Sequence, residues 1–257
     1  PSSDLLLPWF EVDLLPSGVT TLFAVGNAAD RPVDVLAAVH TNWGVRVLEV
    51  PFTLQPGEVR TVNLRDWLAG GETLAAAASG RPSPDSGLYH STEVRPGLAV
   101  GYVTLRTGAS RPDALWGDWF LVDGEGNRAS GDTLADIDRS SPSRDLCRRH
   151  LVRYLNGGGF DGGTELVIWR ETENAPSASA DPGYRLQADA TAFNEPGQPI
   201  DNRQLSLLPV ETVRVSELGL KAPFGSLDLE SEAETFIGVK HTAESRYAVA
   251  YQTYCLP

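Results

Sequence analysis

Short runs of β-branched and aromatic residues that alternate with polar residues constrain this chain more than any other feature. They lie at residues 20–25, 34–41, 45–50, 59–64, 98–105 and 116–122, and each run is bounded by Gly, Pro, Asn or Asp. A period of two is typical of strands, and the 25 glycines and 18 prolines supply turns between them. Helix-forming composition is limited to the brief segments 64–68 and 71–79. Since parallel sheets need long crossover connections, the pattern predicts an all-β antiparallel sandwich.

Four segments of the first half recur, in the same order, in the second half. The pairs are 21–25 with 164–168, 34–42 with 186–194, 52–63 with 205–216, and 98–105 with 247–254. Their offset stays near a constant value of about 150 residues. Four matches in register predict an internal duplication into two tandem immunoglobulin-like β-sandwiches.

The duplication implies a division into three parts. We expect an N-terminal β-sandwich at residues 1–107, a C-terminal β-sandwich at residues 147–257, and an interdomain segment at residues 108–146. The interdomain segment is rich in Asp, Arg, Ser and Gly, but its stretch 115–122 is too apolar for a free linker. We therefore expect this segment to pack at the junction of the two domains.

The charge of the chain excludes some partners. Lys and Arg total 21 against 34 Asp and Glu, a formal net charge of −13, and the basic residues form no cluster. Nucleic acid and anionic membrane surfaces are therefore not expected as partners. No apolar stretch reaches the length of about 18 residues that a transmembrane helix needs.

The 257-residue chain contains no Met and begins at Pro1. Either an N-terminal piece is removed in the cell or the sequence has been trimmed. Removal of a secretion signal is the interpretation we favour, and it predicts an extracytoplasmic protein, periplasmic or secreted.

The chain has two cysteines, Cys147 and Cys255. A disulfide between them would suit an exported protein and would close a loop of roughly a hundred residues, for which chain-entropy models give ~4–5 kcal/mol of stabilisation. The alternative is two unrelated buried thiols.

One segment is similar to a calcium-binding loop. Its oxygen ligands at alternate positions are Asp123, Glu125, Asn127 and Asp132. The sixth position of the loop is Arg128 rather than Gly, and the twelfth is Leu134 rather than Glu. A hairpin turn is the favoured interpretation, with calcium as the weaker alternative.

No cofactor or catalytic motif emerges from the spacing. Residues 157–162 match the dinucleotide-binding pattern in their glycines, but a strand follows instead of the required helix, so we predict a Gly-rich hairpin. The four histidines, His40, His90, His150 and His241, lack zinc-ligand spacing and are interpreted as isolated surface residues. A zinc site composed of histidines distant in sequence is the weaker alternative. No nucleophile elbow is present.

Of the six tryptophans, most are expected in the core. Trp43 lies at an expected turn, and Trp116 and Trp119 flank Gly117-Asp118 in the interdomain segment. These three are the candidate interface aromatics, because an exposed aromatic can anchor a protein or a sugar.

Four segments, 5–13, 20–27, 117–123 and 156–163, resemble a group of functionally uncharacterised exported bacterial proteins. The resemblance implies secretion and a pair of β-sandwiches, and it carries no catalytic residues.

We therefore expect a non-catalytic exported structural or interaction protein, an extrinsic or accessory subunit that docks on a larger envelope or membrane-associated assembly. The alternative is a carbohydrate-binding module or accessory protein that uses exposed Trp residues. An enzyme whose site the sequence does not reveal ranks third. Docking requires an apolar patch, whereas sugar binding requires exposed aromatic faces beside hydrogen-bonding groups.

Overall fold

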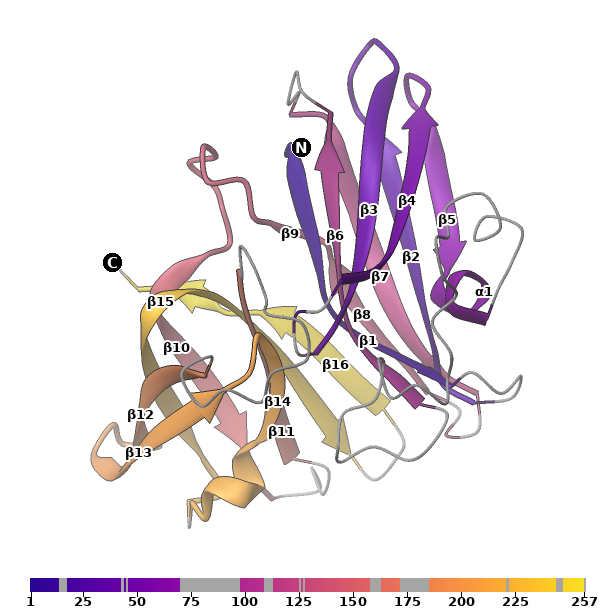
Figure 1. Cartoon of the computed structure of the whole chain (residues 1–257). Coiled ribbons are helices and arrows are strands. Elements are labelled where there is room, and N and C mark those ends of the chain that lie inside the picture. The colour runs from indigo at the N-terminus through magenta and orange to yellow at the C-terminus, as the bar shows by residue number, and fades with distance from the viewer. Residues whose placement is uncertain are drawn as a thin grey trace. The chain divides into compact units, whose positions relative to one another are not determined.

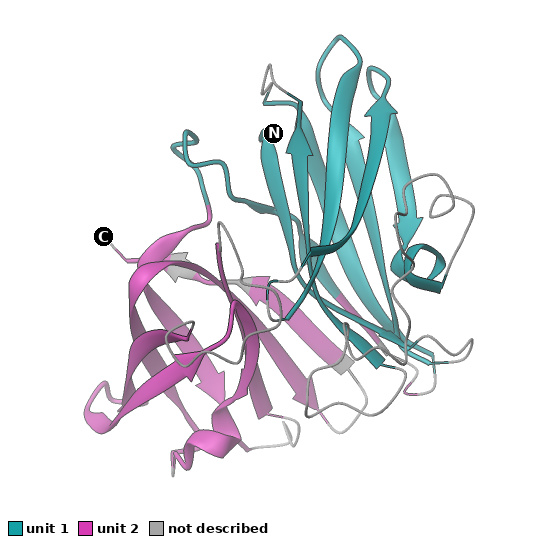
Figure 2. Ribbon diagram, in the orientation of Figure 1, with its two compact units in different colours: residues 1–125, 131–144 teal, residues 126–130, 145–257 magenta. Residues whose placement is uncertain are grey.

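The computed structural model describes residues 1–13, 18–42, 44, 46–69, 98–108, 113–124, 126, 128–157, 163–171, 185–220, 222–243 and 247–256. Within these ranges the chain is all-β, as predicted, with one short α-helix. It divides into two compact units, which are unit 1 (residues 1–125 and 131–144) and unit 2 (residues 126–130 and 145–257) (Figures 1 and 2). No helix in the described ranges is long and apolar enough to cross a membrane.

Unit 1 is a sandwich of two sheets. One sheet has the strand order β4-β3-β6-β1-β9, and the other has the order β5-β2-β7-β8. The strands are β1 (Asp4–Asp13), β2 (Thr20–Asn27), β3 (Val33–Thr41), β4 (Arg46–Leu54), β5 (Val59–Asn63), β6 (Leu98–Thr107), β7 (Leu115–Asp123), β8 (Arg128–Thr133) and β9 (Ala135–Asp136). Strands β2 to β7 coincide with the six alternating runs of the sequence. Strand β6 differs from the others in being buried on both faces along most of its length.

The two sheets of unit 1 share one apolar core. Helix α1 (Leu64–Ala69) follows β5 and adds Trp67, whose ring meets that of Phe23 edge to face at 5.5 Å. The pairing of β1 with β6 shifts register between Leu7 and Phe10, at Pro8, because proline has no N–H to donate. The second expected helix, at residues 71–79, lies outside the described residues.

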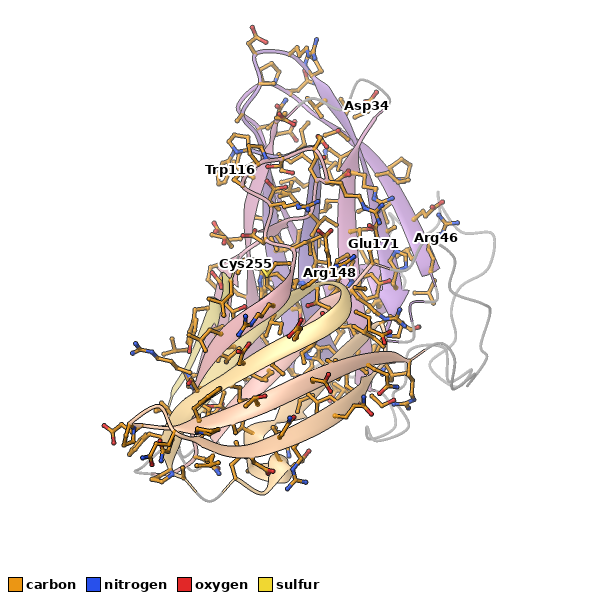
Figure 3. All side chains as sticks on the ribbon, turned by 90° about the vertical axis from the view of Figure 1, so that its left-hand side faces the viewer. Asp34, Arg46, Trp116, Arg148, Glu171 and Cys255 are labelled. Carbon is orange, nitrogen blue, oxygen red and sulfur yellow. A yellow bond between two sulfur atoms is a disulfide. The ribbon has the colours of Figure 1, made fainter. Side chains whose placement is uncertain are left out.

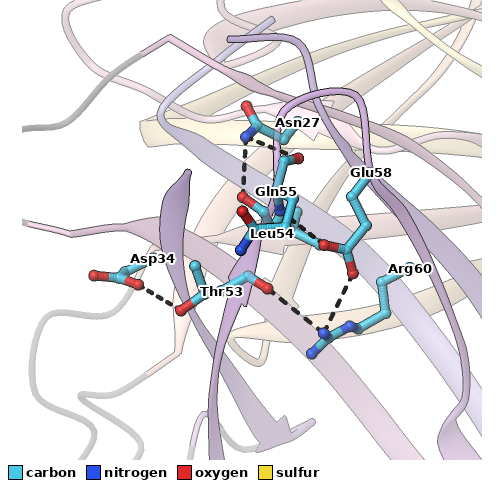
Figure 4. A network of polar contacts seen from close by, with 7 residues as sticks. All are labelled: Asn27, Asp34, Thr53, Leu54, Gln55, Glu58 and Arg60. Carbon is cyan, nitrogen blue, oxygen red and sulfur yellow. Dashed lines mark hydrogen bonds and ion pairs between the residues drawn. The ribbon is translucent and has the colours of Figure 1, made fainter. Parts of the chain in front are cut away.

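Asn27, at the end of β2, ties the two sheets together. The residue is 1% exposed, and its Nδ2 donates to the carbonyl of Arg31 at 2.8 Å. The same Nδ2 donates to the carbonyls of Leu54 and Gln55 at 3.1 and 3.2 Å (Figure 4). Its Oδ1 accepts from the N–H of Ala29 at 2.8 Å. One buried amide thus satisfies three backbone carbonyls, one of them at the end of β4 in the opposite sheet.

Residues 108–146 lie differently from the expected interdomain segment. They supply β7, β8 and β9, which pair with β2, β7 and β1 in unit 1. The Oγ atoms of Ser2 and Ser3 donate to the carboxylates of Asp136 and Asp138, each at 2.6 Å. The sheets of unit 1 therefore extend well past residue 107, because β2 and β1 need these later strands as partners.

Unit 2 is organised around one long strand, β15. The first part of β15 pairs with β10 and β12, and its second part pairs with β11 and β16. The strands are β10 (Cys147–Leu155), β11 (Gly163–Arg170), β12 (Leu186–Asn194), β13 (Pro199–Leu207), β14 (Val210–Arg214), β15 (Phe224–Ala243), β16 (Tyr247–Gln252) and β17 (Tyr254–Cys255), and a 3-10 helix, η3, spans Val215–Leu218. Apolar side chains from both parts of β15 meet in one core.

The strand orders of the two units correspond one to one. In unit 2 the order β13-β12-β15-β10-β17 matches β4-β3-β6-β1-β9, and the order β14-β11-β15-β16 matches β5-β2-β7-β8. The two parts of β15 occupy the places of β6 and β7, and η3 follows β14 as α1 follows β5. The two units differ chiefly in this strand. Unit 1 has two separate strands, β6 and β7, where unit 2 has the single continuous strand β15.

Three of the four sequence repeats pair strands that hold equivalent places. The fourth, which matches 98–105 with 247–254, was wrong: β6 lies between β3 and β1, whereas β16 is an edge strand beside β15. Alternating strands resemble one another whatever their place in a sheet, so pattern alone could not separate them.

Candidate functional site

The outward side of the four-stranded sheet of unit 1, which we call the outer face, is unusually apolar. The side chains on this side are Thr20, Leu22 and Ala24 of β2, and Val59, Thr61 and Asn63 of β5. From β7 come Trp116, Asp118, Phe120 and Val122. The solvated side of an antiparallel sheet is commonly polar, so this composition calls for an explanation.

Trp116 lies in the last outward row of the sheet, beside Gly26 of β2 and Val59 of β5. It pairs directly with Gly26, and a Cβ built on that glycine would lie 2.4 to 2.6 Å from three indole atoms. The indole therefore occupies the space over Gly26 that a side chain would fill, and 43% of Trp116, labelled in Figure 3, remains exposed. A bare glycine in a strand leaves such a gap, and an aromatic neighbour fills it.

Phe120 repeats this arrangement two outward positions further along β7, with Asp118 between the two rings. It is 48% exposed, and its Cδ1 lies 2.6 Å from where a Cβ of Gly131 would stand. Val59, the exposed neighbour on β5, is 47% exposed. Two aromatic rings and one aliphatic side chain thus stand on the same side of the sheet.

The other candidate tryptophans do not join Trp116. Trp119 is buried, contrary to our expectation, with 8% of the residue exposed. Positions three apart on a regular strand point to opposite faces, so Trp116 and Trp119 could not both be outward. Trp43 lies outside the described residues.

The predicted disulfide between Cys147 and Cys255 is confirmed. The two Cα atoms are 5.7 Å apart, and the bridge joins β10 to β17. Cys147 is half-buried and Cys255, labelled in Figure 3, is exposed.

His150 packs against this disulfide, not on the surface as expected. It is 1% exposed, and its Nδ1 and Nε2 lie 3.5 and 3.3 Å from Cys147 Sγ. Nε2 faces the carbonyls of Thr235 and Cys147 at 3.0 and 3.2 Å, and Nδ1 lies 2.8 Å from the Thr253 hydroxyl. Burial lowers the pKa of His150, against hydrogen bonds to the two carbonyls that raise it. Cys147, His150 and Cys255 are the group of potential metal ligands that the described residues bring together.

His241 is buried, although we expected it on the surface. It lies in the middle of a series of hydrogen bonds that runs from Thr164 to Tyr251. Thr164 Oγ1 donates to the carbonyl of Leu155, so it accepts from His241 Nδ1 at 2.9 Å, and His241 Nε2 then accepts from the Tyr251 hydroxyl at 2.8 Å. Burial lowers the pKa of His241 and raises that of Tyr251. The series joins β11, β15 and β16 and serves packing.

His40 is also held in place by its surroundings. Its ring stacks on that of Tyr102 with centroids 4.6 Å apart. Burial lowers the pKa of His40 to about 4; a hydrogen bond to Gly44 opposes the shift, and Arg46 and Arg106 add to it. His90 lies outside the described residues.

The candidate calcium residues are only partly described. Strands β7 and β8, which flank the segment, are neighbours in the sheet, so the segment joins two paired strands. Asp123 ends β7 and Asp132 lies in β8, while Glu125 and Asn127 lie outside the described residues. Neither aspartate belongs to a group of three potential metal ligands among the residues described.

The predicted Gly-rich hairpin falls on residues 157–162, of which 158–162 lie outside the described residues. The strands on either side, β10 and β11, pair with other strands in the part of the chain that is described. The residues that follow this segment, Gly163–Arg170, form a strand, as predicted.

A small cavity in the core of unit 2 has no acid–base group. Its lining is Ile168, Ala188, Leu207, Leu229, Ser231, Thr235 and Ile237. Aliphatic walls with two hydroxyls suit packing rather than catalysis.

Comparisons with protein-family models, curated proteins and solved structures give no match to this chain.

Proposed function

We propose that this chain is a non-catalytic interaction protein that docks on a larger protein assembly through the outer face of unit 1. The observation that carries the proposal is the pair of exposed rings, Trp116 and Phe120, standing beside Val59 on one side of a sheet.

The composition of the outer face favours a protein partner. Asp118 is the single charged side chain among the outward positions of β2, β5 and β7 that are described, and aliphatic side chains surround the two rings. Cores of protein interfaces are rich in aromatic residues and poor in charge. Trp116 is also positioned at little entropic cost, because the backbone of Gly26 already holds its ring.

A carbohydrate ligand is the second candidate. The exposed indole of Trp116 offers a stacking surface for a sugar ring, and Asp118 and Thr61 lie in the row between Trp116 and Phe120. These polar groups are few, which is why we rank a protein partner first.

We also propose that the units are tandem immunoglobulin-like domains from an internal duplication. Strands β1, β6 and β3 follow the order B, E and D of that fold, and β2, β7 and β8 follow C, F and G. Strands β4 and β5 would be an insertion, and β9 would fill the place of strand A. The matching order in unit 2 supports the duplication, with β15 as E and F joined.

We propose an extracytoplasmic location for the chain, in the envelope or beyond it. The Cys147–Cys255 disulfide supports this, since disulfides persist in oxidising compartments.

The test uses comigration of the tagged full chain with native complexes from an envelope extract. Replacing Trp116 and Phe120 with Ala should weaken binding by about thirtyfold or more, as expected when interface hot spots worth about 2 kcal/mol are lost. The matched control replaces Leu151 and Ile200, which are exposed to a similar degree in unit 2, with Ala and should comigrate unchanged.

Equal loss in the control, or no loss in the double variant, would contradict docking at the outer face. Displacement of the chain by soluble oligosaccharides, with no protein partner retained, would instead identify the second candidate.

A further inference from the structure

Cys147, His150 and Cys255 offer three metal-ligand atoms within 4.8 Å of one another. His150 and Cys255 are direct partners in the pairing of β10 with β17. Cys147 lies three residues before His150, a spacing that would place the two on opposite faces of a regular strand. The register of β10 shifts between Cys147 and Arg149, and this irregularity brings Cys147 and His150 to the same side.

We propose that reduction of the Cys147–Cys255 disulfide converts this cluster into a Cys2His site for zinc or a similar thiophilic divalent cation. Each cysteine supplies a thiolate and His150 supplies its Nδ1. A solvent molecule takes the fourth position, because Cys255 is exposed.

The chemistry balances with a dithiol as the reductant. The dithiol transfers two electrons and two protons, so its own two sulfurs become a disulfide while the Cys147–Cys255 bond breaks and two thiols form. The cation then replaces the two thiol protons, which leave to solvent, and forms two metal–sulfur bonds and one metal–nitrogen bond.

The spacing fits a tetrahedral zinc ion. Bonds of about 2.3 Å to sulfur and about 2.1 Å to nitrogen place the ligand atoms of such a site roughly 3.5 to 3.8 Å apart. The distance from Cys147 Sγ to His150 Nδ1 is already 3.5 Å. Once the bond is broken, side-chain rotation can separate the two sulfurs, since their Cα atoms are 5.7 Å apart.

The surroundings of His150 resemble those of a metal ligand. A ligating histidine donates its other N–H to a carbonyl or carboxylate, which fixes the tautomer. Nε2 of His150 faces the carbonyl of Thr235 at 3.0 Å and can only donate to it, so Nδ1 is left with its lone pair. That lone pair meets the Thr253 hydroxyl at 2.8 Å, and the hydroxyl can turn back to the carbonyl of Ile237, 3.0 Å away, when the ring moves to a cation.

The test titrates the full chain with Co²⁺ alone, after reduction with a dithiol and anaerobic removal of the dithiol. We expect one Co²⁺ per reduced chain, with thiolate-to-cobalt charge-transfer absorption that Zn²⁺ abolishes, and no such absorption from the oxidised chain. His150→Gln should bind Co²⁺ at least about tenfold more weakly, the lower end of what loss of even a supporting group costs metal sites. The matched control, His241→Gln, removes another buried histidine of unit 2 and should bind as the parent does.

A reduced chain without the charge-transfer absorption, or a His150→Gln chain that binds as tightly as the parent, would overturn the proposal. If His150→Gln does not fold, Cys255→Ser tests one thiolate, and X-ray absorption of the zinc-loaded parent tests for the imidazole, whose absence overturns the site. If reduction itself unfolds unit 2, refolding on addition of Co²⁺ supports the site, and failure to refold overturns it.

Discussion

The indole of Trp116 covers Gly26, its direct partner across β7 and β2, where a Cβ would lie 2.4 to 2.6 Å from three indole atoms. This single relationship keeps a large aromatic ring exposed and yet ordered, and it accounts for a glycine inside a strand. The unfolding and binding behaviour of unit 1 should both reflect it.

Gly26→Ala should displace Trp116 rather than break the sheet, because the atoms in the way belong to a side chain. We expect a loss of about 1 kcal/mol in the free energy of unfolding and more rapid selective oxidation of Trp116. Gly108→Ala is the matched control, since its Cβ would meet nothing closer than 3.8 Å. Unchanged oxidation of Trp116 in the Gly26→Ala chain would contradict the packing of the indole over Gly26.

Asn27→Ala should destabilise unit 1 by about 1–3 kcal/mol, because it leaves buried backbone carbonyls without their donor. Urea unfolding followed by tryptophan fluorescence measures the change. Asn202→Ala, at an exposed position of β13, should stay close to the parent. Equal midpoints for the two variants would refute the role of Asn27 in joining the sheets.

Reduction should destabilise unit 2 and leave unit 1 nearly unchanged, since both cysteines lie in unit 2. For a separation of 108 residues, chain-entropy models predict a loss of about 4–5 kcal/mol. Hydrogen exchange with and without a reductant, read separately for β2 and β11, would measure it. If reduction lowers the protection from hydrogen exchange equally in β2 and β11, the prediction that the disulfide stabilises unit 2 alone is wrong.

Acid should destabilise unit 1 through His40, whose pKa burial lowers from 6.5 to about 4. As the pH falls from about 6.5 to about 4, the unfolded chain binds a proton at His40 and the folded chain does not, so stability falls by up to about 3 kcal/mol. His40→Gln should lose less stability over this range, which urea unfolding near pH 7 and near pH 4 would measure. A variant as acid-sensitive as the parent would exclude His40 as the cause.

Much of the fold could be predicted from local pattern. The six alternating runs became β2 to β7, and residues 64–68 became α1, because strand and helix preferences act over a few neighbouring residues. The disulfide was also predictable, since the chain has only two cysteines to pair.

The candidate sites were less accessible to sequence reasoning. Alternation along a strand could have separated Trp116 from Trp119, once both were placed on one strand. No local sequence pattern predicted that His150 lies beside the two cysteines. This proximity depends on the register shift in β10 and on the pairing of β10 with β17.

The sequence by itself determined the all-β class, the strands β2 to β7, the net negative charge and the two cysteines that could pair. Only the tertiary structure decided that β7 and β9 complete the sheets of unit 1, that β15 replaces two strands, and which aromatic and histidine side chains are exposed. The preference of a segment for the strand conformation depends on residues that are near in sequence. The partners, register and irregularities of that strand depend on residues that are far away in sequence.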